Sequence, residues 1–168
     1  AYRLTTHLIE QGYQRIAFIY GTTSATGRQR HEGYVTAMAT HGLETLTQAV
    51  PATVEAARAA AGELTRGRPL PEALVGSNGL ILLGLVEALR AAQLQFPEQI
   101  ALAGFDDLPW TRLVGSGITV IAQPTYDIGQ AAIELLLQRI AHSSHSVRRV
   151  VLRGELRERG SSMRRSMK

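Results

Sequence analysis

Short apolar runs alternate with longer segments of helical period along this chain of 168 residues. The runs at residues 16–20, 73–76 and 100–104 hold few polar side chains, as expected of strands buried on both faces of a sheet. Segments with apolar residues every three to four positions lie between these runs and predict helices. The alternation predicts an α/β fold in which helices cover both faces of a Rossmann-like parallel sheet.

The same patterns set the expected limits of each element. Helices are predicted over residues 3–11, 28–40, 53–65, 80–92 and 125–141, and strands over residues 16–20, 46–50, 73–76, 100–104, 119–122, 149–152 and 155–157. Thr53 and Asn78 stand where helix N-caps are expected.

Helix 80–92 is apolar nearly all round and helix 125–141 has an apolar stripe, which is more apolar surface than one lobe can cover. We therefore expect these two helices to contact a partner.

The composition excludes several classes of protein. There is no cysteine, which excludes disulfides, thiolate catalysis and zinc–thiolate sites. No apolar run approaches the roughly 20 residues of a membrane-spanning helix, and the first residues lack a signal-peptide pattern, so a cytoplasmic protein is expected.

His142 and His145 have a spacing that could chelate a metal, but no third ligand is near them in the sequence. We therefore expect an exposed loop there and no metal site.

The positive charge is concentrated at one end of the chain. The formal net charge is +4, and residues 148–168 alone carry eight basic and two acidic side chains. The other residues therefore have a net charge of −2, which does not fit the basic surface of a DNA-binding domain. Residues 159–168 are rich in serine and arginine and are expected to form a disordered basic tail.

The motifs of common enzyme classes are not found in the sequence. It has no phosphate-binding P-loop, no Gly-x-Gly-x-x-Gly after a predicted strand, and no Gly-x-Ser-x-Gly turn of a hydrolase. We therefore expect neither catalysis nor a cofactor.

Polar side chains instead follow the predicted parallel strands, at the edge where open α/β sheets bind ligands. These candidate ligand-binding residues are Ser24, Thr26, Arg30, Asn78 and Asp106. Amide, carboxylate and guanidinium groups together suit a ligand with many hydroxyl groups, and an arginine can also hold a carboxylate. Arg28 leaves the helix about 200° away from Arg30, so the two cannot face the same crevice.

Two of these residues also have a structural interpretation. Asn78 can cap helix 80–92, and Asp106 or Asp107 can cap the turn that follows its strand. For each residue alone, the structural and the ligand-binding interpretations stay open.

Five segments, taken in order along the chain, carry a resemblance to a known family. They are residues 7–21, 28–34, 73–78, 97–107 and 119–129. The Gly-Phe-Asp-Asp sequence in the fourth segment and the Ala-Gln-Pro sequence in the fifth are the most specific. Together the segments resemble the lactose-repressor/galactose-repressor (LacI/GalR) family of bacterial transcription regulators.

The resemblance implies an effector-binding domain over residues 1–158, similar to the C-terminal half of a type I periplasmic-binding-protein-like fold. Residues 1–121 would then form mainly the C-terminal lobe, and residues 122–152 would pack on the N-terminal lobe in intact family members. The residues that match the family's ligand-contacting positions or fall in its ligand loop are Ser24, Thr26, Arg30, Asn78 and Asp106.

The expected function is therefore effector sensing and dimerisation in a bacterial transcriptional repressor. The family implies a sugar or sugar-acid effector, a homodimer formed through helix 80–92, and operator DNA bound only by an N-terminal domain that this chain lacks. Two alternatives remain open. One is an extracytoplasmic sugar-binding protein of the same fold, and the weaker one is a sugar-processing α/β enzyme that would use Asp106 and His31.

Overall fold

A six-stranded sheet forms the centre of the protein, with the strand order β2-β1-β3-β4-β5-β6. The structure, a computed structural model, describes residues 1–141 and 146–164. The strands are β1 (Ile16–Gly21), β2 (Leu46–Val50), β3 (Ala73–Gly76), β4 (Ala101–Phe105), β5 (Thr119–Ala122) and β6 (Glu155–Arg157). The helices are α1 (Tyr2–Glu10), α2 (Ala25–Thr40), α3 (Val54–Arg66), α4 (Gly79–Ala91) and α5 (Thr125–Ala141), with 3-10 turns η1 (Pro109–Arg112) and η2 (Gly160–Ser162). Strands β1 to β5 are parallel and β6 is antiparallel, which confirms the predicted α/β class.

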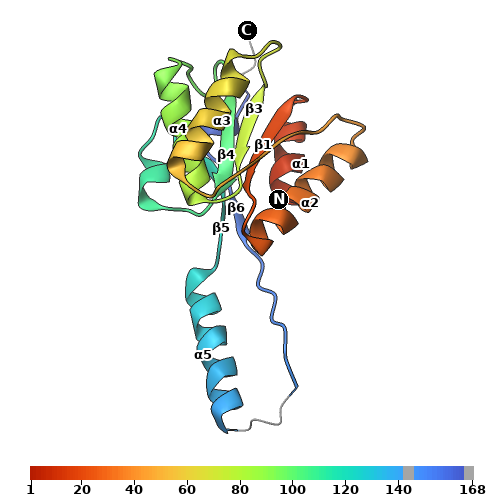
Figure 1. The fold of residues 1–168 in the computed structure, drawn as a ribbon, viewed down its shortest axis with the longest axis vertical. Coiled ribbons are helices and arrows are strands. Elements are labelled where there is room, and N and C mark those ends of the chain that lie inside the picture. Colours follow the sequence, from red (N-terminus) through yellow and green to blue (C-terminus); the bar gives the residue numbers. More distant parts are fainter. Residues whose placement is uncertain (142–145, 165–168) are drawn as a thin grey trace.

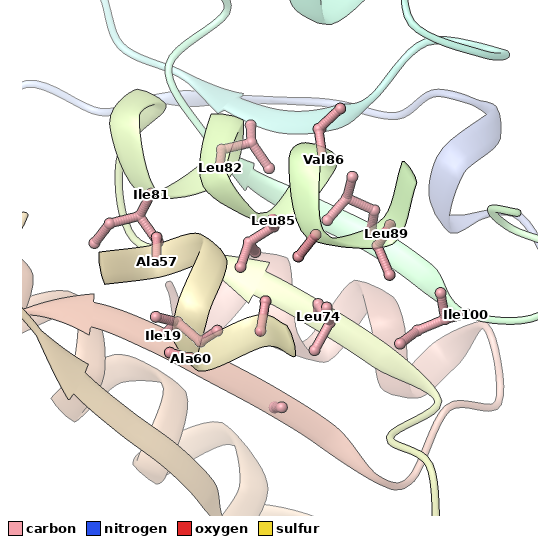
Figure 2. Close-up of a cluster of buried hydrophobic side chains, with 14 of the residues drawn as sticks. Ile19, Ala57, Ala60, Leu74, Ile81, Leu82, Leu85, Val86, Leu89 and Ile100 are labelled. Carbon is pink, nitrogen blue, oxygen red and sulfur yellow. The ribbon is translucent and has the colours of Figure 1, made fainter. Parts of the chain in front are cut away.

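The central strands are apolar throughout because helices cover both faces of the sheet (Figure 1). Alternate residues of β1 separate onto the two faces: Ile16 and Phe18 pack with α1 and α2, whereas Ala17 and Ile19 pack with α3 and α4. Ile81 and Leu85 of α4 point towards α3 and the sheet (Figure 2). A strand buried in this way needs no polar face, which explains why the apolar runs predicted it.

Helices α3 and α4 approach each other closely at Gly84. A Cβ atom at this position would lie 2.5 Å from the carbonyl oxygen of Val54 and 2.7 Å from the Cβ of Ala57. Glycine and alanine at the contact therefore let the two helices pack at short distance. Most large apolar side chains of α4 are buried within the lobe, although Leu80 remains 54% exposed. The lobe thus covers more of the apolar surface of α4 than expected and leaves Leu80 at the start of the helix exposed.

Some predicted boundaries also differ from the observed ones. The predicted N-caps are confirmed, since Thr53 caps α3 and Asn78 caps α4. Helix α2 starts three residues earlier than predicted, because Ser24 caps it. Residues 149–152 do not form the predicted strand. Their β-branched residues favour extended structure, but a strand also requires a neighbouring strand to pair with.

The C-terminal segment differs most from its prediction. Residues 159–164 pack against the sheet and do not form a disordered tail, and residues 165–168 lie outside the described residues. The Ser161 hydroxyl donates to the Leu102 carbonyl at 2.5 Å and accepts from the Thr119 N–H at 2.9 Å. Ser162 is also buried and contacts the ring of His7 at 2.8 Å. These hydroxyl groups satisfy buried polar atoms, a use that the serine-rich composition alone does not reveal.

Helix α5 extends away from the rest of the protein, and the chain returns from it through residues 146–154 (Figure 1). None of its residues is buried, and its exposed side chains include Ile133, Leu136 and Ile140. Among the described residues, exposed large apolar side chains are thus concentrated on α5 and on the segment that returns from it. Among the residues that the structure describes, no helix is long and apolar enough to cross a membrane. The predicted loop containing His142 and His145 lies outside the described residues.

Candidate functional site

Three neighbouring parallel strands, β1, β3 and β4, end at the same edge of the sheet. Asn78 comes two residues after β3, and Asp106 comes directly after β4. Arg30 lies in α2, the helix that follows β1. The topology therefore brings an amide, a carboxylate and a guanidinium from distant parts of the sequence to one edge.

Arg30 lies across the ends of β3 and β4. Its Nη1 donates a hydrogen bond to the Ser77 carbonyl oxygen at 2.5 Å, and its Cζ lies 4.2 Å from the centre of the Phe105 ring. Burial lowers the pKa of Arg30, and the negative charge of Asp106 opposes this shift. Arg30 is thus a half-buried cation, held over an aromatic ring and electrostatically coupled to Asp106.

Asn78 and Asp106 meet at the N-terminus of α4. The Oδ1 atom of Asn78 accepts a hydrogen bond from the Ile81 N–H at 2.9 Å, so this residue is an N-cap. The Oδ2 atom of Asp106 accepts from the Gly79 N–H, also at 2.9 Å. The structural interpretation of Asn78 is therefore correct. The Asp106 carboxylate also has a structural role, but at the start of α4 and not in the turn that follows its own strand. Neither role excludes ligand binding, because the amide NH₂ of Asn78 is not used by its cap and a carboxylate can accept several bonds.

The backbone at Asp106 is unusual, with a φ of +74°. This left-handed conformation costs a residue other than glycine about 1–2 kcal/mol. Gln123 Nε2 also donates a hydrogen bond to Asp106 Oδ1. Residues held in such a strained conformation are often found at functional sites. Sequence reasoning assigned no role to Gln123, since its distance from Asp106 in the chain hides the contact.

Ser24 and Thr26 follow the carboxyl end of β1, and their hydroxyl groups bond to each other and to the start of α2. The two hydroxyl oxygens are 2.7 Å apart, and Ser24 Oγ also accepts from the Gly27 N–H at 3.3 Å. Arg28 is exposed and donates to the Thr22 carbonyl oxygen. Arg28 and Arg30 therefore bond to different parts of the sheet edge, Arg28 after β1 and Arg30 after β3.

Asp107, next to Asp106, belongs to a different cluster. Its carboxylate accepts from Arg112 Nη2 at 2.8 Å and from Arg159 Nη2 at 2.6 Å. Burial by itself would raise the pKa of Asp107, but the hydrogen bonds and charges of the two arginines outweigh burial and lower it. No sequence pattern indicates this role of Arg159, which lies in the segment predicted to be a tail.

The arrangement gives little support to an enzyme. The ring of His31 stacks on Tyr20, with ring centres 4.3 Å apart, on the face of the sheet covered by α1 and α2. Ser162, His7 and Glu158 follow one another in the order of a hydrolase triad. Ser162 is fully buried, however, and its hydroxyl also contacts Thr119, so a substrate cannot reach it. In residues 1–141 and 146–164, no group of three or more His, Asp or Glu side chains is placed to hold a metal ion.

A parallel sheet flanked by helices, with polar side chains from neighbouring strand ends at one edge, is the architecture of an α/β ligand-binding lobe. A family model described as a periplasmic binding protein-like domain matches residues 5–162. The chain belongs to this family, in the form found in LacI/GalR regulators.

Individual relatives support the same assignment. The ribose operon repressor of Escherichia coli K12 is 34% identical over 163 residues, which cover 94% of this chain and 49% of the repressor. A solved complex of the transcriptional regulator CelR with cellobiose is 32% identical, with a TM-score of 0.87 over 94% of this chain and 49% of that protein. A LacI-family repressor structure from Corynebacterium glutamicum has the same TM-score at 27% identity, covering 96% of this chain and 62% of that one. The chain thus spans about half the length of the curated repressor.

Proposed function

We propose that this chain is the effector-sensing lobe of a cytoplasmic LacI-type transcriptional repressor and that its effector is a sugar or a sugar acid. The observation that carries the proposal is the convergence of Arg30, Asn78 and Asp106 at one sheet edge. The names of two similar proteins, a ribose operon repressor and a regulator in complex with cellobiose, support a sugar as the effector class.

The three side chains offer complementary chemistry to such a ligand. Asp106 can accept hydrogen bonds from neighbouring hydroxyl groups, and the Asn78 NH₂ can donate to a ring or hydroxyl oxygen. Arg30 uses one N–H on Ser77, which leaves other donors to hold a hydroxyl or a carboxylate. Ser24 and Thr26 supply hydroxyl groups at the carboxyl end of β1. In this proposal the protein binds its effector without catalysis, cofactor or metal.

The response to the effector involves the part of the protein that precedes this chain. We assign operator binding to an N-terminal domain outside these 168 residues, and we expect residues 122–152, including α5, to pack on a second lobe. An effector that prefers one arrangement of the two lobes shifts the population towards it and so changes the spacing of the DNA-reading domains. Its effect can be no larger than its difference in affinity for the two arrangements.

The proposal includes a homodimer formed through the start of α4. Leu80 is 54% exposed and Leu108, whose side chain lies against Gly79, is 38% exposed. Two exposed leucines beside the end of a helix can form the centre of a subunit contact.

A thermal-shift assay with this chain tests the effector class. Ribose, cellobiose, lactose and gluconate are added separately at about 10 mM, and binding to the folded state raises the melting temperature by mass action. We expect at least one of them to raise it in the wild type and to have no effect on Asp106→Asn, which keeps the size of the side chain. No shift with any of the four, or an equal shift in the variant, would contradict the proposal.

A further inference from the structure

Asp107 follows the proposed ligand residue Asp106 and makes contacts that ligand binding does not itself require. Its Oδ1 accepts a hydrogen bond from Arg159 Nη2 at 2.6 Å, and its Oδ2 accepts one from Arg112 Nη2 at 2.8 Å. The side chains of Asp107 and Arg159 are 13% and 17% exposed, whereas that of Arg112 is 62% exposed. The pair with Arg159 is therefore the part of this cluster that is shielded from water.

Arg159 is itself held at a fixed place beside the sheet. Its Nη1 donates to the Ile118 carbonyl oxygen at 2.8 Å, and its backbone N–H donates to Thr119 Oγ1 at 2.8 Å. The guanidinium thus joins the start of β5 to the turn after β4. A planar guanidinium can bond both partners at once, which the single ammonium group of a lysine cannot do with the same geometry.

The residue between this anchor and β4 has an unfavourable backbone. Asp106 adopts a φ of +74°, in the left-handed region that residues other than glycine rarely occupy. Its carboxylate nevertheless lies 2.9 Å from the N–H of Gly79, the first residue of α4. An N–H at that position has no acceptor within its own helix, so the bond to Asp106 satisfies it. A left-handed residue keeps its conformation only where its surroundings hold it there.

We propose that Asp107, held by Arg159, is a positioning residue for the effector site. The ion pair fixes the turn at residues 106–107 and so keeps the Asp106 carboxylate on the Gly79 N–H. The importance of this for ligand binding rests on the proposed function, but the position of Asp106 can be tested without any ligand.

The test is amide hydrogen exchange, measured residue by residue in the 168-residue chain and in the variants Asp107→Ala and Arg159→Lys. The first variant removes the anchor, and the second keeps the charge but loses the two-sided contact. We expect the Gly79 amide to exchange about tenfold faster in both variants, because its hydrogen bond opens when Asp106 relaxes.

Three controls separate positioning from a general loosening of the fold. The Ile81 amide is bonded to Asn78 at the same helix end, and the Gln14 amide is bonded to Glu72 in another part of the lobe. Both should change less than about twofold in the two variants. Arg112→Ala removes only the exposed partner of Asp107 and should leave the Gly79 exchange within about twofold of the wild type.

Two results would overturn the proposal. One is unchanged Gly79 exchange in the folded variants, and the other is acceleration at Ile81 and Gln14 equal to that at Gly79. If Asp107→Ala does not fold, Arg159→Lys decides the question by the same criteria. A chain that shows the expected exchange but binds no sugar would support the positioning role and contradict only the proposed function.

Discussion

Arg30 is the residue whose removal should affect ligand binding most clearly. Its guanidinium is partly buried, and we propose that the N–H groups not bonded to Ser77 bind the effector. Arg30→Ala should weaken binding of the sugar or sugar acid by about 1.5–3 kcal/mol, the usual range for a hydrogen bond to a charged group. Isothermal titration calorimetry measures this change. Arg28→Ala is the matched control, since Arg28 is exposed and its guanidinium bonds to the nearby Thr22 carbonyl oxygen. Equal affinities of the two variants would remove Arg30 from the site.

The lowered pKa of Asp107 predicts that the free energy of unfolding depends on pH. This pKa is lowered in the folded protein, so the ionised carboxylate stabilises the fold at pH values above its unfolded pKa of about 3.9. This contribution is lost as the pH falls through the lowered pKa of the folded state. Asp107→Asn should therefore reduce the free energy of unfolding by about 1–3 kcal/mol at pH 7 and by clearly less near pH 3. Urea unfolding at both pH values measures the two differences, and a difference that does not shrink in acid would contradict the assignment.

Single residues also show where sequence reasoning succeeds and where it ends. Asn78 and Asp106 could be placed at one edge because parallel strands end together. The contacts of Asp106 with Gly79 and Gln123 could not be predicted, because they depend on a left-handed backbone that no sequence pattern marked. The role of Arg159 could not be predicted either, because nothing in the sequence indicates its pairing with a carboxylate 52 positions away.

Among the elements, the close contact of α3 with α4 predicts opposite effects for two glycines. An added methyl group at Gly84 would collide with Val54 and Ala57, whereas at Gly62 it would meet only the flexible end of Arg66, at 3.9 Å. Gly84→Ala should lower the free energy of unfolding by about 1–3 kcal/mol. Gly62→Ala should raise it by about 0.5–1 kcal/mol, because alanine favours helix. Chemical denaturation measures both values, and a neutral Gly84→Ala would show that the helices can move apart without cost.

The elements that could be predicted are those whose sequence pattern matches their surroundings. Strands β1, β3 and β4 are covered on both faces, so their apolar runs identified them. Residues 149–152 have a similar pattern, but strand formation also requires a pairing partner, which the described lobe does not offer them. The turn η2 could not be predicted, because polar residues such as Ser161 and Ser162 indicate an exposed segment. In the structure both are buried, and their hydroxyl groups are hydrogen-bonded.

At the scale of the whole molecule, the exposed apolar side chains predict how subunits assemble. If the dimer forms at the start of α4, Leu80→Asp should convert it to a monomer, because a charge in the centre of an interface is costly to bury. Leu136→Asp on α5 introduces the same charge at a side chain that is 59% exposed and should leave the dimer intact. Sedimentation equilibrium at micromolar concentration distinguishes the two results. Dissociation by Leu136→Asp alone would place the interface on α5.

The central claim is that the edge formed by β1, β3 and β4 binds a sugar or sugar acid. The most direct measurement is an NMR titration of the isotope-labelled chain with ribose, cellobiose, lactose and gluconate at concentrations up to about 20 mM, which detects even millimolar affinity. We predict saturable shifts with at least one of these compounds at the Gly79 amide, the Asn78 side-chain amide and the Arg30 guanidinium. Saturable shifts confined to another part of the chain, or none with any of the four compounds, would contradict this account.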